Sequence, residues 1–256
     1  MSVANQTYPN IDHFIVADGP TRVQAVIDAA GKLGPNASIY HTPVITGAHG
    51  FNGHRIYGAM PFLVNAEYVC YLDEDNRFAP EHIATLVALM LKHALDWSYS
   101  LRRIISKRGR YMCNDDCDSL GLWGSWYGNQ NHIDTNCYLL KRDVAIAAAS
   151  IWHRKGYQKT VLDPDKALCR WLLQHHLRGF TTGLYTVDYR LGSSKRSVKK
   201  DYFEYGNKTM KRLFREFPWR APLLEAIDER INYRRVVSAC EPNAAELSRN
   251  LRTRAS

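Results

Sequence analysis

An apolar run that ends in a cluster of carboxylates constrains this chain more than any other segment. Residues 66–72 read AEYVCYL, and their β-branched and aromatic side chains are typical of a buried strand. Asp73, Glu74 and Asp75 follow directly. On an extended backbone Asp73 and Asp75 point to the same side, so a cation between them would relieve their repulsion. Because Mg²⁺ binds one or two carboxylates together with substrate phosphates, the pair predicts a metal–diphosphate site. A polar turn ending at Asn76 is the alternative.

The length and composition are those of a soluble globular protein. The 256 residues, 45% hydrophobic and 23% charged, suit one large domain or a domain with a tail. No stretch approaches the roughly 20 apolar residues that span a bilayer, and no signal peptide is visible, so we expect a cytoplasmic protein. Six cysteines predict reduced thiols rather than a disulfide scaffold. Zinc binding by Cys113, Cys117, Cys137 and His132 is an alternative, although their spacing matches no strong zinc pattern.

An excess of positive charge predicts an anionic partner. The formal net charge is +9, and basic residues are dense from Lys195 to Arg254. A nucleotide, a phosphorylated acceptor or an anionic membrane would satisfy this charge; nucleic acid is not expected, because no nucleic-acid motif is present. Phe214, Phe217 and Trp219 lie among these basic residues, as in a segment that contacts a membrane surface peripherally. A helix that closes the main domain is the alternative.

Strand and helix patterns alternate along the chain and predict an α/β fold. We expect strands over residues 11–17, 38–41, 66–72, 97–106, 133–140 and 182–189. We expect helices over residues 21–31, 55–65, 80–91, 141–153 and 165–177, and a glycine-rich loop over 112–130. A domain over 1–192 would then carry a basic, mainly helical extension over 193–256. In such sheets ligands bind at the carboxyl ends of strands, where Asp18 and Asp73 both lie.

Four ordered blocks between residues 2 and 190 carry a family resemblance. SVANQTYPNI at 2–11, followed by FIVADG at 14–19, resembles the early segment SVLxQTYPNIEIIVVDDGS of the family 2 glycosyltransferases. YLDED at 71–75, with Pro80 after it, resembles their metal motif. DTNCYLLKRDV at 134–144 resembles their acceptor-side strand, and DKALCR at 165–170 resembles their base motif. Each block is weak by itself, and their order along the chain makes the match specific.

The resemblance implies a GT-A fold, a mixed sheet flanked by helices, and inverting sugar transfer from a nucleotide-sugar linked to UDP, GDP or dTDP. Asp18 would contact the nucleobase or ribose. Asp73 and Asp75 would hold Mn²⁺ or Mg²⁺ on the donor diphosphate. Asp165 would be the general base that deprotonates the acceptor hydroxyl, which belongs to a saccharide or another alcohol.

The chemistry of the reaction favours the same residue types. A cation neutralises the departing diphosphate, and a carboxylate within hydrogen-bond reach removes the proton of a weakly nucleophilic hydroxyl. Asp163 is a rival base two residues away; Asp165 is preferred because its spacing to Leu168 and Arg170 matches the motif. A helix N-cap is the alternative role for Asp165.

Other residues are candidates on their chemical type. Trp123, Trp126 and Asp134 could form the acceptor site, since aromatic rings stack on sugars; packing in the core is the alternative for the two tryptophans. His54 and Arg55 could contact the donor phosphates, and an exposed first helical turn is the alternative. Arg190 opens a basic segment to Lys200 that could close over the diphosphate, with a linker as the alternative.

One departure from the family pattern leaves a second function open. The match begins after the strand with which the family pattern normally starts, so we expect a central sheet that lacks one strand and a more open donor site. A non-catalytic or nucleic-acid-binding basic module on a degenerate GT-A fold is therefore the alternative function. A nucleotidyltransferase is disfavoured, because no glycine-rich basic loop follows Val16.

Overall fold

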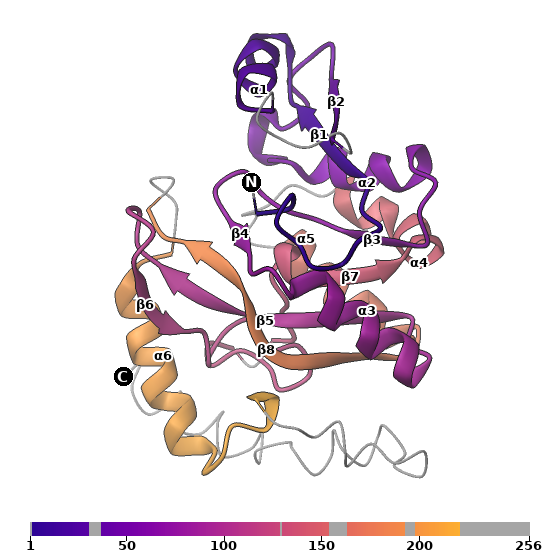
Figure 1. Ribbon diagram of the computed structural model, residues 1–256. Coiled ribbons are helices and arrows are strands. Elements are labelled where there is room, and N and C mark those ends of the chain that lie inside the picture. The colour runs from indigo at the N-terminus through magenta and orange to yellow at the C-terminus, as the bar shows by residue number, and fades with distance from the viewer. Residues whose placement is uncertain (1, 31–36, 129, 154–162, 193–197, 221–256) are drawn as a thin grey trace.

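A mixed six-stranded sheet flanked by helices forms the centre of the molecule (Figure 1). The computed structural model describes residues 2–30, 37–128, 130–153, 163–192 and 198–220. Strands and helices alternate as the sequence predicts, and the architecture is α/β. Among the described residues, no helix combines the length and the apolar character that a membrane crossing requires.

The sheet has the strand order β3-β7-β5-β8-β4, and β6 pairs with β5 outside this path. The strands are β3 (Tyr68–Cys70), β4 (Arg77–Phe78), β5 (Trp97–Ile105), β6 (Tyr111–Asn114), β7 (Tyr138–Lys141) and β8 (Gly179–Arg190). Only the β5–β8 pair is parallel within these strands, and it runs from Trp97–Gly179 to Ile105–Arg190. Gly179 is required there, because a Cβ at this position would lie 1.8 Å from the Trp97 ring.

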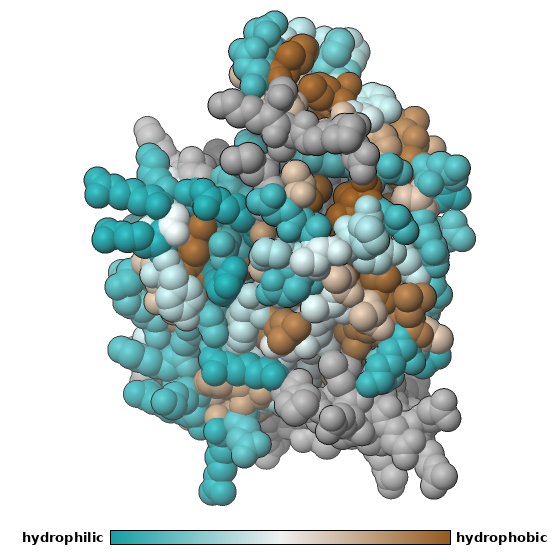
Figure 2. All heavy atoms as spheres, viewed as in Figure 1, coloured by the Kyte–Doolittle hydropathy of each residue, from teal (hydrophilic) through white to brown (hydrophobic). Residues whose placement is uncertain are grey.

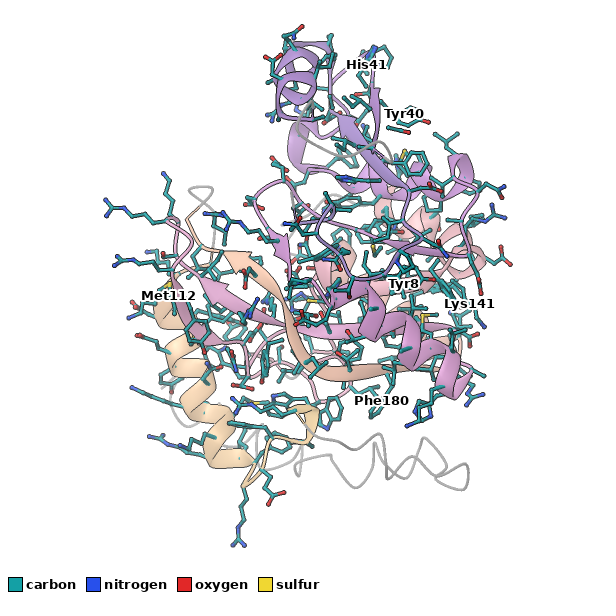
Figure 3. All side chains as sticks on the ribbon, in the orientation of Figure 1. Tyr8, Tyr40, His41, Met112, Lys141 and Phe180 are labelled. Atoms are coloured by element: carbon teal, nitrogen blue, oxygen red, sulfur yellow. The ribbon has the colours of Figure 1, made fainter. Side chains whose placement is uncertain are left out.

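A small second sheet carries the N-terminal segment. In it β1 (His13–Ala17) and β2 (Ala37–His41) pair in parallel, and α1 (Val23–Ala30) connects them in sequence. Residues 2–12 form no strand, and β1 and β2 pair only with each other within the described chain. Figure 3 shows Tyr40 and His41 on β2, at the outer edge of this small sheet. Within the described chain, β1 is thus joined to the main sheet by loops rather than by strand pairing.

Helices cover the central sheet and supply much of its core. They are α2 (His54–Leu63), α3 (His82–His93), α4 (Arg142–Ala147), α5 (Pro164–Gln174) and α6 (Lys200–Leu213). On α3 the side chains of Ile83, Leu86, Val87 and Met90 are buried, but Leu91 is 66% exposed. The α3 helix ends in a left-handed cap at Ala94, whose N–H donates to the carbonyls of Leu91 and Met90.

Several predicted elements differ in extent from the observed ones; the strand predicted over 66–72, for example, is confined to Tyr68–Cys70. Residues 112–114, predicted as loop, belong to β6, because the turn at residues 106–110 returns the chain against β5. The strand predicted over 133–140 begins only at Tyr138, because the Asp134 side chain caps a short 3₁₀ turn over Thr135–Cys137.

The described part of the basic extension packs onto the core. Phe203, Met210 and Trp219 are buried in the same hydrophobic cluster as β5 and β8. Trp219 packs between Phe214 and Phe217, which favours the closing-helix alternative over a membrane segment for these aromatic residues. Residues 221–256, with much of the predicted basic helical region, lie outside the described residues.

Candidate active site

The acidic turn after β3, residues 73–76, is held by hydrogen bonds from polar side chains of other elements. Asn136 both accepts from and donates to Asp73. Its Oδ1 accepts from the Asp73 N–H at 2.6 Å, and its Nδ2 donates to Asp73 Oδ2 at 3.0 Å. The hydroxyl of Tyr57 donates to Asp73 Oδ1. Burial outweighs these hydrogen bonds and raises the pKa of Asp73 to about 6, with further contributions from the charges of Asp134 and Asp75.

Arg190 fixes the backbone of the acidic turn. It is the last residue of β8, not part of a loop, and its N–H donates to Asn76 Oδ1 at 3.0 Å. Its guanidinium donates from Nε to the Asp75 carbonyl at 2.9 Å, and from a second nitrogen to the Lys107 carbonyl at 2.8 Å. Residues 193–197 of the predicted closing loop lie outside the described residues.

The two carboxylates of the turn suit a cation that also binds phosphate. The half-buried Asp75 side chain makes no hydrogen bond with the described residues, and Asp73 lies two positions before it. No group of three His, Cys, Asp or Glu side chains within the described ranges could hold a metal alone. Two carboxylates fit Mg²⁺ or Mn²⁺ only when substrate oxygens complete the set, which is the usual composition of a metal–diphosphate site.

Asp18 shapes the loop that follows β2. Its carboxylate accepts from the N–H of Thr46 at 2.7 Å, from the N–H of Gly47 at 2.8 Å, and from the hydroxyls of Thr46 and Thr42. These hydrogen bonds outweigh burial and lower the pKa of Asp18. The residue lies at the end of β1 as predicted, and its oxygens are engaged by its own chain.

His54 and Arg55 begin α2 beside this loop. Arg55 donates to the Thr46 carbonyl at 3.3 Å, and its guanidinium lies 3.5 Å from the centre of the Phe51 ring. The His54 ring lies 6.0 Å from that of Trp152. Arg55 and Trp152 also line a cavity of about 190 Å³ together with Gly58, Ala149 and His153.

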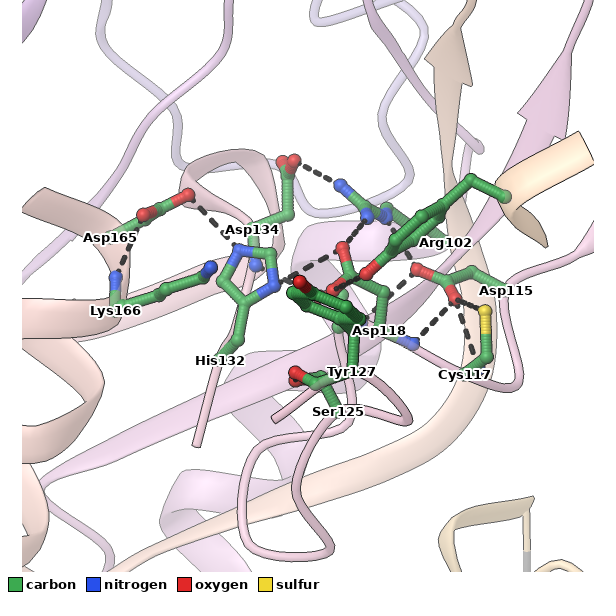
Figure 4. A network of polar contacts seen from close by, with 12 residues as sticks. Arg102, Asp115, Cys117, Asp118, Ser125, Tyr127, His132, Asp134, Asp165 and Lys166 are labelled. Carbon is green, nitrogen blue, oxygen red and sulfur yellow. Dashed lines mark hydrogen bonds and ion pairs between the residues drawn. The ribbon is translucent and has the colours of Figure 1, made fainter. Parts of the chain in front are cut away.

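A buried arginine pairs with three carboxylates (Figure 4). Arg102, on β5, has a side chain that is 3% exposed, and it pairs with Asp115 at 2.7 Å, with Asp118 at 2.8 Å and with Asp134. These charges outweigh burial and raise the pKa of Arg102. Asp134, predicted to contact the acceptor, thus forms an ion pair with Arg102 and accepts two hydrogen bonds from Asn136.

Asp165 lies in the first turn of α5 and faces a histidine. Its Oδ1 accepts from the Lys166 N–H at 2.8 Å, and its Oδ2 lies 3.0 Å from His132 Nε2. The N-cap position belongs to Asp163, so the capping alternative for Asp165 is wrong. The charge of His132 outweighs burial and lowers the pKa of Asp165, while Asp118 and Asp165 together raise the pKa of His132 to about 10.

The two predicted acceptor tryptophans have different environments. Trp123 is 5% exposed and packs against Phe180 and Trp219, which is the core alternative. Trp126 is half-buried, and its ring contacts those of Tyr127, Tyr202 and Tyr205. Tyr127 beside it is 68% exposed, so an aromatic surface does exist at this loop.

One continuous polar network links the acidic turn to the predicted base. It runs through Asp73, Asn136, Asp134, Arg102, Asp118, His132 and Asp165. The sequence reading missed Tyr57, Asn136, Arg102 and Asp118, and considered His132 only for zinc. The available signals were an arginine inside an apolar strand and three aspartates within residues 115–118.

Comparison with protein families decides the classification. The family described as glycosyl transferase family 2 matches residues 1–147, more than half of the 256-residue chain. The chain belongs to this family. The predicted family and the predicted GT-A-type fold are confirmed. No curated protein matches the chain.

Solved structures of S. aureus TarS share the fold at low sequence identity. The TarS 1–349 structure in complex with UDP is 14% identical over 82% of this chain, with a TM-score of 0.52. The complex with UDP-GlcNAc is 13% identical over 79% of this chain, with a TM-score of 0.55. This chain spans 58% of the length of each of those chains, and the likeness shows the GT-A fold alone.

Proposed function

We propose that the chain transfers a sugar from a nucleotide-sugar to an acceptor hydroxyl with inversion at the anomeric carbon. The observation that carries this proposal is the polar network joining the acidic turn at Asp73 to the ionised carboxylate of Asp165. Family membership supports glycosyl transfer, and the UDP and UDP-GlcNAc of the TarS structures favour a UDP-linked donor over a GDP- or dTDP-linked one.

In this proposal Asp165 acts on the acceptor, and Asp73 and Asp75 act on the donor. Asp165 takes the proton of the acceptor hydroxyl, whose oxygen forms the new bond to the anomeric carbon from the face opposite the nucleotide. The bond to the nucleotide diphosphate breaks, and its electron pair leaves with the phosphate oxygen. Asp73 and Asp75 would hold Mn²⁺ or Mg²⁺, which when bound neutralises charge on that diphosphate.

Replacing Asp75 by Asn is expected to remove metal-assisted donor binding. Asp75 makes no side-chain hydrogen bond within the described chain, so its loss should spare the fold. We expect the affinity for UDP-GlcNAc in the presence of Mn²⁺ to fall by about tenfold or more, equivalent to about 1.4 kcal/mol. Calorimetry with UDP-, GDP- and dTDP-sugars, each with and without Mn²⁺, measures this effect.

The exposed neighbour Glu74 provides the matched control. Glu74→Gln should bind the donor as the unaltered chain does, because it removes one charge from the same turn without touching the pair. Donor binding that is equal with and without Mn²⁺, or equal in Asp75→Asn and the unaltered chain, would contradict the metal assignment. Salt-dependent binding of DNA without nucleotide-sugar binding would instead favour the basic-module alternative.

Basic side chains gather around the β5–β6 hairpin beside the acidic turn. This basic hairpin cluster consists of Arg77, Lys107, Arg108, Arg110 and Arg190. The first four are exposed and form no ion pair within the described residues, and the guanidinium groups of Arg77 and Arg190 both lie about 4 Å from the position of a Cβ on Gly109. Figure 2 shows hydrophilic side chains projecting from the edge where Figure 1 places this hairpin.

We propose that the basic hairpin cluster binds an acceptor that carries negative charge. Arg190 contacts both the hairpin and the acidic turn, so a polyanion bound here would reach the donor site. Exposed ion pairs contribute about 0.2–1 kcal/mol each, so changing Arg108 and Arg110 to Ser should weaken binding of a polyphosphate chain by about three- to tenfold. The ionic-strength dependence of binding, measured by fluorescence anisotropy, should become shallower.

The control removes equal charge from the end of α6. Lys211 and Arg212 are exposed there, and changing both to Ser should leave polyphosphate binding unchanged. Equal losses of polyphosphate affinity in the two double variants would mean that binding depends only on net charge, and would contradict the proposal. Preferential binding to vesicles of anionic lipid over polyphosphate would assign the cluster to a membrane surface instead.

A further inference from the structure

His132 lies between two carboxylates and is held there by its backbone (Figure 4). Its side chain is 7% exposed; Nε2 lies 3.0 Å from Asp165 Oδ2, and Nδ1 lies 3.3 Å from Asp118 Oδ2. The His132 carbonyl accepts from the Gly121 N–H at 2.8 Å. Nε2 lies at hydrogen-bond distance from one carboxylate, and Nδ1 lies within ion-pair distance of a second carboxylate without the geometry of a hydrogen bond. A ring placed between two negative charges favours the imidazolium form, which carries two protons.

Asp118, the partner of the His132 ring on the side away from Asp165, is itself held by other side chains. Asp118 Oδ2 also pairs with Arg102 at 2.8 Å, and its Oδ1 accepts from the Tyr202 hydroxyl at 2.9 Å. The imidazole ring therefore has a fixed support on one side and Asp165 on the other. A side chain with this support can determine where the Asp165 carboxylate lies.

Among the charged and titratable groups around Asp165, His132 is the cation with the largest effect on its carboxylate. Lys166 follows it on α5, and its charge lowers the pKa of Asp165 less than that of His132 does. Cys169 on α5 and Tyr138 on β7 also approach Asp165, and burial raises the pKa of both, so each remains neutral near pH 7. Without His132, the half-buried carboxylate would face desolvation with little compensation and would take up a proton more readily.

We infer that His132 is a positioning residue, an imidazolium that Asp118 anchors and that holds Asp165 oriented and ionised for proton abstraction. This inference rests on the proposed function, in which Asp165 is the base. A protonated Asp165 could not take the acceptor proton, so the charge of His132 sets the fraction of the enzyme that can react. As an imidazolium, His132 has no free lone pair with which to act as the base itself.

The first test needs no catalytic activity. In protein labelled with ¹³C at aspartate and histidine, His132→Gln should move the titration midpoint of the Asp165 carboxyl upward by about 1–3 pH units. An unmoved midpoint would overturn the inference. His82→Gln is the control, because His82 is fully buried with a pKa lowered to about 3 and contacts Thr186 instead of a carboxylate.

The second test follows the magnetic resonance signals of His132 in the unaltered chain, so it can be carried out even if His132→Gln does not fold. The His132 ring signals should show no titration between pH 5 and pH 8.5, and a midpoint near the ordinary value of about 6.5 would overturn the inference. In turnover assays His132→Gln should shift the acid limb of kcat to higher pH with the donor KM unchanged. Absence of turnover in the unaltered chain would defeat the proposed function, while the two resonance measurements would still decide the role of His132.

Discussion

Replacing Asp165 by Asn is expected to lower kcat for sugar transfer by about 10²- to 10⁴-fold, the usual contribution of a general base. The amide has nearly the same shape as the carboxylate, but it cannot accept the proton of the acceptor hydroxyl. The affinity for UDP-GlcNAc should stay unchanged, since Asp165 makes no contact with the acidic turn at Asp73 except through the polar network. Transfer assays and donor calorimetry on the same preparation separate the two effects.

Asp163 supplies the matched control for this substitution. It occupies the N-cap position of α5, and Asp163→Asn removes a carboxylate two residues away while keeping a residue type that is equally favourable at an N-cap. We expect near-full turnover in that variant. A large loss in Asp163→Asn together with little loss in Asp165→Asn would exchange the roles of the two residues. Little loss in either variant would mean that the base is elsewhere.

The parts of this site that the sequence predicts are the parts with local signals. Asp73 and Asp75 directly follow an apolar run, and Asp165 opens an amphipathic helix, so residue order alone places each at the end of an element. The strands β5 and β8 are long and apolar enough to be visible without their partners. The family resemblance adds the roles, because each motif sits at the expected end of its element.

The local signals of the Arg102 cluster do not show that its members meet. Its partners lie 13, 16 and 32 residues further along the chain, the first two in the predicted loop over 112–130 and the third in the predicted strand over 133–140. An arginine in a strand usually points to water, and aspartates among glycines usually form turns. Only the crossing of β5 beneath these segments makes the same residues buried ion-pair partners.

Two further residues show why chemical type alone leaves the role of a residue open. Trp123 and Asp134 have the properties of a sugar-binding site, yet the first packs in the core and the second serves Arg102 and Asn136. Aromatic rings and carboxylates serve packing and capping as well as ligands, and the choice depends on which face of the fold the loop presents. Sequence patterns leave that face undetermined.

Replacing Arg102 by Met is expected to cost about 3–5 kcal/mol of unfolding free energy at pH 7, as for other buried ion pairs that lose one partner. The substitution leaves Asp115, Asp118 and Asp134 buried together without their shared cation. Methionine fills most of the vacated volume, so the loss measures charge rather than a cavity. Urea denaturation followed by circular dichroism gives the free energy directly.

The pH dependence of this loss separates charge from packing. In the unaltered protein, His132 and Arg102 hold the pKa of Asp118 well below its ordinary range, so its stabilising contribution is present above the unfolded value and is lost as pH falls through the folded one. In Arg102→Met the carboxylates lack this cation and bind protons more readily, so acid should relieve their repulsion. The deficit of the variant should therefore shrink between pH 7 and pH 5.

The neighbouring strand residue tests whether burial is the cause. Arg103 pairs with Asp188 at 2.8 Å, but their side chains are 35% and 24% exposed, so solvent screens the pair. Arg103→Met should cost no more than about 1 kcal/mol. Similar losses at 102 and 103, or a loss at 102 that does not change with pH, would mean that the carboxylates around Arg102 are balanced by other charges. Such a result would also weaken the case for Asp118 as the anchor of His132, because that anchor depends on Arg102.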